Sequence, residues 1–114
     1  MRKTILSIFR KIEKSTWSLS IKSFIDSEET KLLSDQPGNY IASDLIAELK
    51  IRSNTVNQSK TKAVGIVELL NTLEKTSEDQ IFKSYIFKGQ GKTAIIYLDE
   101  KSVNIFGAIL LDRA

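Results

Sequence analysis

The sequence predicts a single α+β domain in which helices pack on an antiparallel sheet formed mainly by the C-terminal third of the chain. Apolar residues recur mostly at helical spacing in the first two thirds, whereas after residue 80 they fall into short strand-like runs. A glycine-bearing loop of hairpin length, at residues 89–92, separates two of these runs. The 114 residues are enough for one hydrophobic core and contain no linker-like segment, so we expect residues 1–114 to form one domain.

The N-terminal third is expected to hold a helix, a strand and a second, short helix. Apolar residues between Ile5 and Ile12 recur at the spacing of one helix face, which predicts an amphipathic helix over 2–14. Alternating apolar and polar residues predict a strand over 16–25 that joins the sheet. The acidic residues that follow suit a helix N-terminus and predict a short helix ending near Leu33.

Two longer helices are expected in the middle of the chain. A turn at 35–39, which contains the only proline, precedes them. Residues 43–44, Ser and Asp, are suitable N-caps for the first helix. We expect a break near 52–54, and a second helix that begins at this break or near Ser59 and ends near Lys75.

The last third is expected to form a three-strand antiparallel meander over 81–88, 93–98 and 103–111. The four residues from Ile95 to Leu98 are all apolar, which is typical of a strand that is covered on both faces in the middle of a sheet. The N-terminal strand would join this meander, and three to four helices would pack on the sheet.

The chain contains neither cysteine nor histidine, and this bounds its chemistry. Without cysteine there is no disulfide, thiolate metal site or thiol nucleophile. Without histidine the commonest general base and the commonest metal ligand are missing. The acidic residues cluster at expected turns and helix starts, where capping and solubility account for them. We therefore expect no catalytic residue, metal or cofactor, and a protein that is not an enzyme.

No apolar stretch approaches the length of a membrane span. The N-terminus starts with charged residues, but Arg10 and Lys11 interrupt it before an apolar core of signal-peptide length is reached. A cytoplasmic protein is therefore expected.

The segment from Leu49 to Val67 contains no Asp or Glu, although lysine, arginine, amide and hydroxyl side chains are frequent in it. Such side chains contact phosphates and base edges. Residues 43–56 resemble a helix-turn-helix, and the hairpin at 81–98 resembles the wing of a winged-helix domain. The resemblance implies a winged-helix-like unit at about 43–98 that binds nucleic acid. Its expected contacts are Lys50, Arg52, Asn54, Thr55, Asn57, Gln58, Lys60, Lys62, Lys88 and Lys92.

A second hypothesis remains open beside the first. The protein would be a protein-binding inhibitor, such as a bacterial immunity or antitoxin-type protein, that neutralises a partner such as a toxin through a shaped, charged surface. Its expected docking residues are Asp26, Glu28, Glu29, Asp35, Glu74, Glu78 and Asp79. The edge of the C-terminal sheet would also allow strand addition to a partner or to a second copy of the chain.

Overall fold

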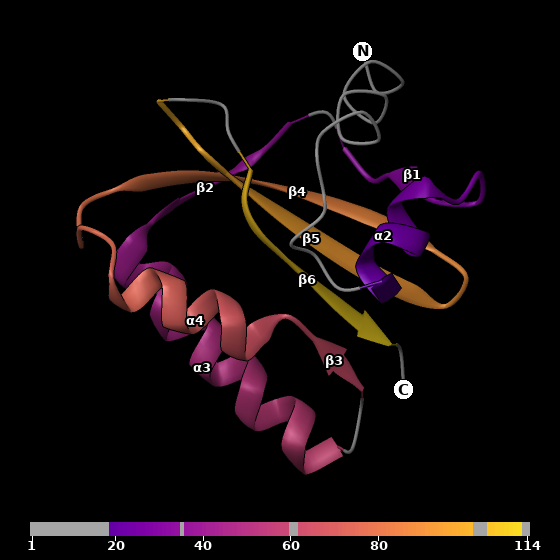
Figure 1. The fold of residues 1–114 in the computed structure, drawn as a ribbon, viewed down its shortest axis with the longest axis horizontal. Helices are drawn as coiled ribbons and strands as arrows, with labels where there is room; N and C mark the ends of the chain where they lie inside the picture. The colour runs from indigo at the N-terminus through magenta and orange to yellow at the C-terminus, as the bar shows by residue number, and fades with distance from the viewer. Residues whose placement is uncertain (1–18, 35, 60–61, 102–104, 113–114) are drawn as a thin grey trace.

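The structure is a computed structural model that describes residues 19–34, 36–59, 62–101 and 105–112. In these residues three helices and an antiparallel sheet form an α+β domain, as predicted (Figure 1). The helices are α2 (Leu19–Asp26), α3 (Ala42–Ser59) and α4 (Ile66–Glu74). The strands are β1 (Lys31–Leu32), β2 (Gly38–Ile41), β3 (Ala63–Val64), β4 (Ile81–Gly89), β5 (Lys92–Asp99) and β6 (Ile105–Asp112).

The predicted C-terminal meander is confirmed as β4, β5 and β6, which pair in chain order. The short strands extend it on both sides. Strands β1 and β2 both pair with the outer edge of β4, and β3 pairs with β6. Strand β5 therefore lies inside the sheet, where each of its two edges has a long partner.

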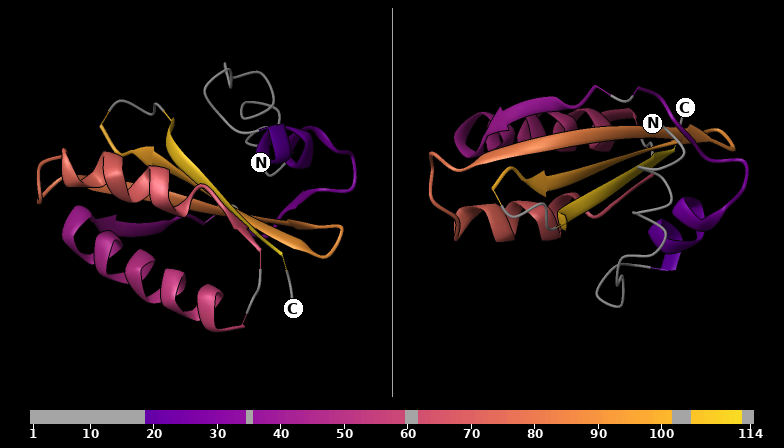
Figure 2. Two further views of the ribbon diagram at one scale, coloured as in Figure 1. Left: turned by 60° about the horizontal axis from the view of Figure 1, so that its bottom comes forward. Right: turned by 90° about the horizontal axis from the view of Figure 1, so that it is seen from above.

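Apolar side chains cover both faces of β5, as the run from Ile95 to Leu98 predicts. Ile95 and Tyr97 belong to the core beneath α3 and α4, whereas Ile96 and Leu98 belong to the core beneath α2. The first core is completed mainly by Leu45, Leu49, Ile66, Leu69, Leu73, Phe82 and Ile109. The second is completed mainly by Ile21, Phe24, Ile25, Leu32, Phe87 and Leu110. Figure 2 shows α3 and α4 side by side, with α2 across the sheet from them.

Two expectations for the N-terminal third are wrong. The described part of the expected strand at 16–25 forms helix α2, because Ile21, Phe24 and Ile25 recur at helical spacing and are all buried. The segment after α2 forms a turn and strand β1 in place of a short helix. Within it, the buried Thr30 hydroxyl donates a hydrogen bond to the Phe24 carbonyl oxygen at 2.5 Å. The helix expected at 2–14 lies outside the described residues.

The helix break expected at 52–54 is also wrong, since α3 is one helix of 18 residues through this segment. No glycine or proline interrupts it, and Leu45, Leu49 and Val56 keep one side against the core. The second helix begins only at Ile66, after β3. The helix-turn-helix expected from the sequence therefore does not form, although the hairpin of β4 and β5 does.

Gly65 makes the connection between β3 and α4 possible. Its φ of 94° lies in the left-handed region, and a Cβ atom there would stand 2.4 Å from the carbonyl oxygen of Ala108 on β6. The backbone thus approaches the sheet closely just before α4 starts. None of the described helices has the length and apolar character needed to cross a membrane.

Candidate functional site

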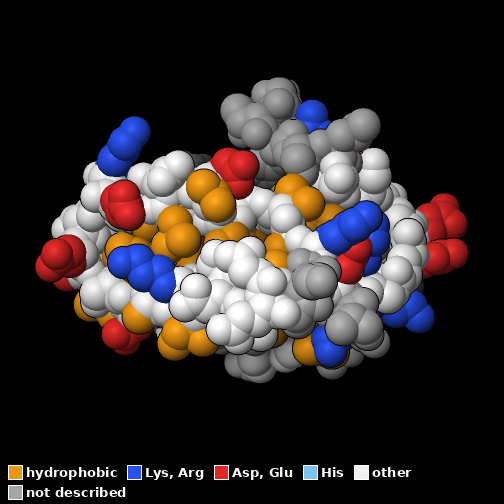
Figure 3. Space-filling model, turned by 90° about the horizontal axis from the view of Figure 1, so that it is seen from below, with side chains coloured by type: hydrophobic (Ala, Val, Ile, Leu, Met, Phe, Trp, Pro, Cys, Tyr) orange, Lys and Arg blue, Asp and Glu red, His pale blue; other side chains and the backbone are white. Residues whose placement is uncertain are grey.

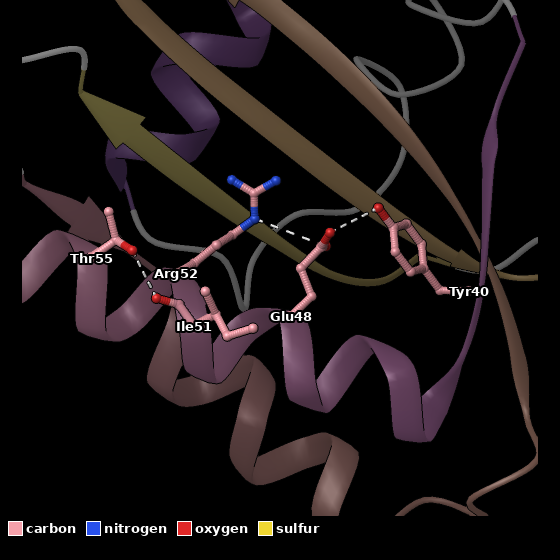
Figure 4. Close-up of polar contacts among 5 residues, drawn as sticks. All are labelled: Tyr40, Glu48, Ile51, Arg52 and Thr55. Atoms are coloured by element: carbon pink, nitrogen blue, oxygen red, sulfur yellow. Dashed lines mark hydrogen bonds and ion pairs between the residues drawn. The ribbon is translucent and has the colours of Figure 1, made fainter.

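The expected nucleic-acid contacts on α3 lie along one continuous helix. Lys50, Asn54, Thr55, Asn57 and Gln58 are exposed to solvent. The Thr55 hydroxyl donates a hydrogen bond to the Ile51 carbonyl oxygen at 3.0 Å, so it is engaged with its own helix (Figure 4). Lys60 lies outside the described residues.

Arg52 faces a polar cluster beneath α3. Its Nε lies 3.9 Å from Glu48 Oε2, which is an ion pair without a hydrogen bond. The Tyr40 hydroxyl donates a hydrogen bond to Glu48 Oε1 at 3.2 Å (Figure 4). The Tyr97 ring packs edge-on against Tyr40, with 6.3 Å between ring centroids. Arg52 is thus partly neutralised by the protein itself.

Burial raises the pKa of the Tyr97 hydroxyl, and the charge of Glu48 adds to the effect. The same two causes, in the same order, raise the pKa of Tyr40. Within the described residues the Tyr97 hydroxyl has no hydrogen-bond partner. Both tyrosines are therefore neutral at neutral pH.

The outer side of α3 is largely uncharged and carries an exposed isoleucine. Ala47, Ile51, Asn54 and Gln58 follow one another at intervals of three or four residues, so they share the side away from the sheet. The side chain of Ile51 is 67% exposed, and that of Val67 on the neighbouring α4 is 62% exposed. We call these five side chains the α3–α4 face.

A hollow of about 290 Å³ is lined by Val67, which is the member of the α3–α4 face that it touches. It lies between the C-terminal half of α3, strand β3 and the start of α4. Its lining consists of Ser53, Val56, Asn57, Ala63, Val64, Gly65, Ile66, Val67 and Glu68. Figure 3 shows this side of the molecule, with apolar side chains across its middle and most charged side chains toward its ends. Sequence reasoning missed Ile51 and Val67 as surface residues, because each looks like part of an inward stripe.

The sheet gathers three of the expected cations at one end, away from the outer side of α3. Lys88 lies directly opposite Lys31 on β1. Lys92 lies opposite Asp112, whose backbone N–H donates a hydrogen bond to the Lys62 carbonyl oxygen at 3.0 Å. Asp112 therefore stands between the two lysines. Lys31 was not predicted as a contact, because a helix was expected there.

The acidic residues expected to contact a protein partner form two separate groups. Asp26 ends α2, and Glu28 and Glu29 follow it, with Glu29 against the start of the β4–β5 turn, whereas Glu74, Glu78 and Asp79 precede β4. These groups flank opposite ends of β4, whose nine residues span about 27 Å at the usual strand rise. Asp35 lies outside the described residues. The described acidic residues therefore lie in two patches, and whether either contacts a partner stays a prediction.

Two acidic residues near the start of β4, Asp79 and Asp99, accept hydrogen bonds from neighbouring residues. A hydrogen bond from the Ser77 hydroxyl, at 2.5 Å, lowers the pKa of Asp79. Asp99 accepts hydrogen bonds from the Gln80 amide side chain and the Lys101 backbone. In the part of the chain that the structure describes, no three acidic residues are grouped so as to hold a metal ion.

The chain matches no family model, and no curated protein and no solved structure is found to be similar to it. What the protein binds must therefore be inferred from its own surface.

Proposed function

We propose that the protein is a non-enzymatic binding protein that docks a partner protein on the α3–α4 face. The observation that carries this proposal is the exposure of two large apolar side chains, Ile51 and Val67, on the adjacent helices α3 and α4, where Val67 also lines a hollow. Burying a side chain of this size contributes about 1.5–3 kcal/mol, so a partner that covered both would gain several kcal/mol.

The distribution of charge supports a protein partner. Protein interfaces have an uncharged, partly apolar centre and a polar rim. On α3 and α4 the centre is formed by Ala47, Ile51 and Val67, and exposed charges such as Lys50 and Glu68 lie beside it. The partner is expected to present apolar side chains of its own to this centre.

A nucleic acid fits this face less well. Binding to phosphates requires several cations that can release counterions. Lys50 is the exposed cation among the described residues of α3, Asp44 shares the solvent side of the helix, and Arg52 faces Glu48. The amide side chains alone would not attract a polyanion.

Site-specific photo-crosslinking tests the proposal. A benzophenone amino acid replaces Ile51, Val67 or, as the matched control, Leu33, whose side chain is 49% exposed on another part of the molecule. The full chain is irradiated in the cells that produce it. We expect the same protein adduct from Ile51 and Val67 and none from Leu33.

Three results would overturn the proposal. These are protein adducts of equal yield at all three positions, adducts of Ile51 or Val67 with nucleic acid, and adducts with a second copy of this chain only. The last result would identify self-association, and sedimentation of the purified protein would then show a dimer that the change Ile51→Asp dissociates.

A further inference from the structure

Two lysines of like charge lie directly opposite each other at the hairpin end of the sheet. Lys31 and Lys88 are register partners on antiparallel strands, so their side chains project from the same face. Both are exposed, and within the described residues neither forms an ion pair. Directly opposed like charges destabilise a strand pair. An anion between the two ammonium groups would remove this repulsion.

A hollow of about 500 Å³ lies beside these lysines. It is lined by Glu29, Lys31, Leu32, Leu33, Lys88 and the glycine-bearing turn at 89–91. The space around Gly91 is open, since a Cβ atom there would meet no other atom within 4 Å. A ligand can therefore approach the turn backbone closely.

The turn is held in place by contacts with the segment between α2 and β1. Gln90 and Gly91 have φ angles of 51° and 72°, the left-handed pair of a tight hairpin turn. The Gln90 side-chain amide donates a hydrogen bond to the Ser27 hydroxyl at 2.5 Å. A Cβ atom on Gly89 would stand 2.7 Å from the Glu29 carbonyl oxygen, so the chain before β1 packs closely against the turn. The hollow is thus formed before any ligand binds.

We propose that this hollow binds the dianion of a phosphate monoester. Lys31 and Lys88 supply two positive charges for its two negative charges, and lysine acts as a compact charge that suits phosphate. Leu33, which lines the hollow and is 49% exposed, would contact the organic part of the ester. Glu29 also lines the hollow, and its negative charge would repel the phosphate. The site is independent of the α3–α4 face.

Titration of the full protein with phenyl phosphate, followed by amide NMR at low salt and about pH 8, tests the site, because the second phosphate pKa is about 6. We expect shifts confined to Lys31, Lys88 and the turn. Lys31→Gln and Lys88→Gln should each weaken binding at least about fivefold, since a lost charge-assisted contact costs about 1 kcal/mol or more. Glu29→Gln should tighten binding.

Lys75→Gln is the matched control, because it removes the same charge from an exposed residue after α4. It should leave binding unchanged. Equal weakening by Lys75→Gln, shifts spread over the surface, or no binding would overturn the proposal. Unchanged amide spectra of the free variants will show that each is folded.

The phosphate can belong to a small molecule or to the end of a nucleic acid, and a second titration separates these sources. Short single-stranded DNA is added with and without a 5′-phosphate. If the 5′-phosphate raises the affinity of the DNA above that of phenyl phosphate, and Lys31→Gln removes this increase, the site binds a nucleic-acid end. If the affinity does not exceed that of phenyl phosphate, the site binds a small ester. If DNA with and without the 5′-phosphate bound with equal affinity, and both lysines were needed, the monoester proposal would be contradicted.

Discussion

The hydroxyl of Tyr97 is buried in the core beneath α3 and finds no hydrogen-bond partner in the described part of the chain. The neighbouring Tyr40 hydroxyl, in contrast, bonds to Glu48. A buried polar group without a partner costs roughly 1–3 kcal/mol. The Tyr97 hydroxyl is therefore expected to lower the stability of the fold.

Replacing Tyr97 by phenylalanine is therefore expected to stabilise the protein. The change removes only the unpaired oxygen and keeps the ring that packs against Tyr40. The free energy of unfolding, measured by urea denaturation, should rise by about 1 kcal/mol. Tyr40→Phe, as the control, should lower it by about 0.5–1.5 kcal/mol because a hydrogen bond is lost. A marked loss of stability in Tyr97→Phe would show that its hydroxyl is satisfied after all.

The same tyrosines predict how stability depends on alkaline pH. Burial raises the pKa of Tyr40 and Tyr97 in the fold, whereas in the unfolded chain it is near 10. Below about pH 10 both states hold the proton, and above it the unfolded state loses its protons first. The free energy of unfolding should therefore fall as the pH rises above about 10, and less steeply in Tyr97→Phe. An equally steep fall in this variant would contradict the assignment.

At the scale of elements, the sequence predicts the parts of the fold that depend on local signals. The strands β4, β5 and β6 follow from the glycine-bearing loop at 89–92 and from apolar runs beside it. Strands β1 and β3 have only two residues each and exist through pairing with distant strands. No local pattern marks them, and for this reason Lys31 could not be placed opposite Lys88 in advance.

Segments with two compatible patterns were predicted wrongly. Around Ile21, apolar residues fit both the alternation of a strand and the spacing of a helix, and packing against the sheet selects the helix. In α3 the polar residues at 52–54 look like a break, but tertiary packing of Leu49 and Val56 keeps the helix continuous.

Gly65 allows a direct test of how β3 leads into α4. Gly65→Ala must adopt a positive φ and also place its Cβ against the Ala108 carbonyl oxygen, so we expect a loss of about 2–4 kcal/mol in urea denaturation. Gly91→Ala shares the positive φ but has open space around it, and should lose only about 1–2 kcal/mol. If both variants lost the same stability, the close approach of Gly65 to β6 would be wrong.

At the scale of the whole molecule, the exposed apolar residues and the lysine pair lie on different elements. Ile51 and Val67 are on the helix layer, and Lys31 and Lys88 are at the hairpin end of the sheet. Among the residues that the structure describes, the cations of the basic segment are not gathered in one patch, since Asp112 stands between Lys62 and Lys92 and Glu48 lies beside Arg52. The basic segment found in the sequence is thus divided by the fold, which could not be foreseen without the strand register.

Separate sites predict independent effects. The free-energy changes at distant residues that share no contacts are independent of each other. The variant that combines Ile51→Asp with Lys88→Gln should bind the partner as weakly as Ile51→Asp alone. It should bind phosphate as weakly as Lys88→Gln alone. Calorimetric titration of the double variant measures both. A coupling of more than about 1 kcal/mol between the two changes would mean that one surface serves both ligands.

The most direct test is the affinity of the crosslinked partner, once purified, for the variant that combines Ile51→Asp and Val67→Asp. Both residues are exposed, so the double variant should fold, with stability within about 1 kcal/mol of the parent. We predict that its affinity falls at least about 100-fold, as expected when two central apolar contacts of an interface are lost, whereas Leu33→Asp binds like the parent. Unchanged affinity of the double variant would contradict the assignment of the α3–α4 face as the docking surface.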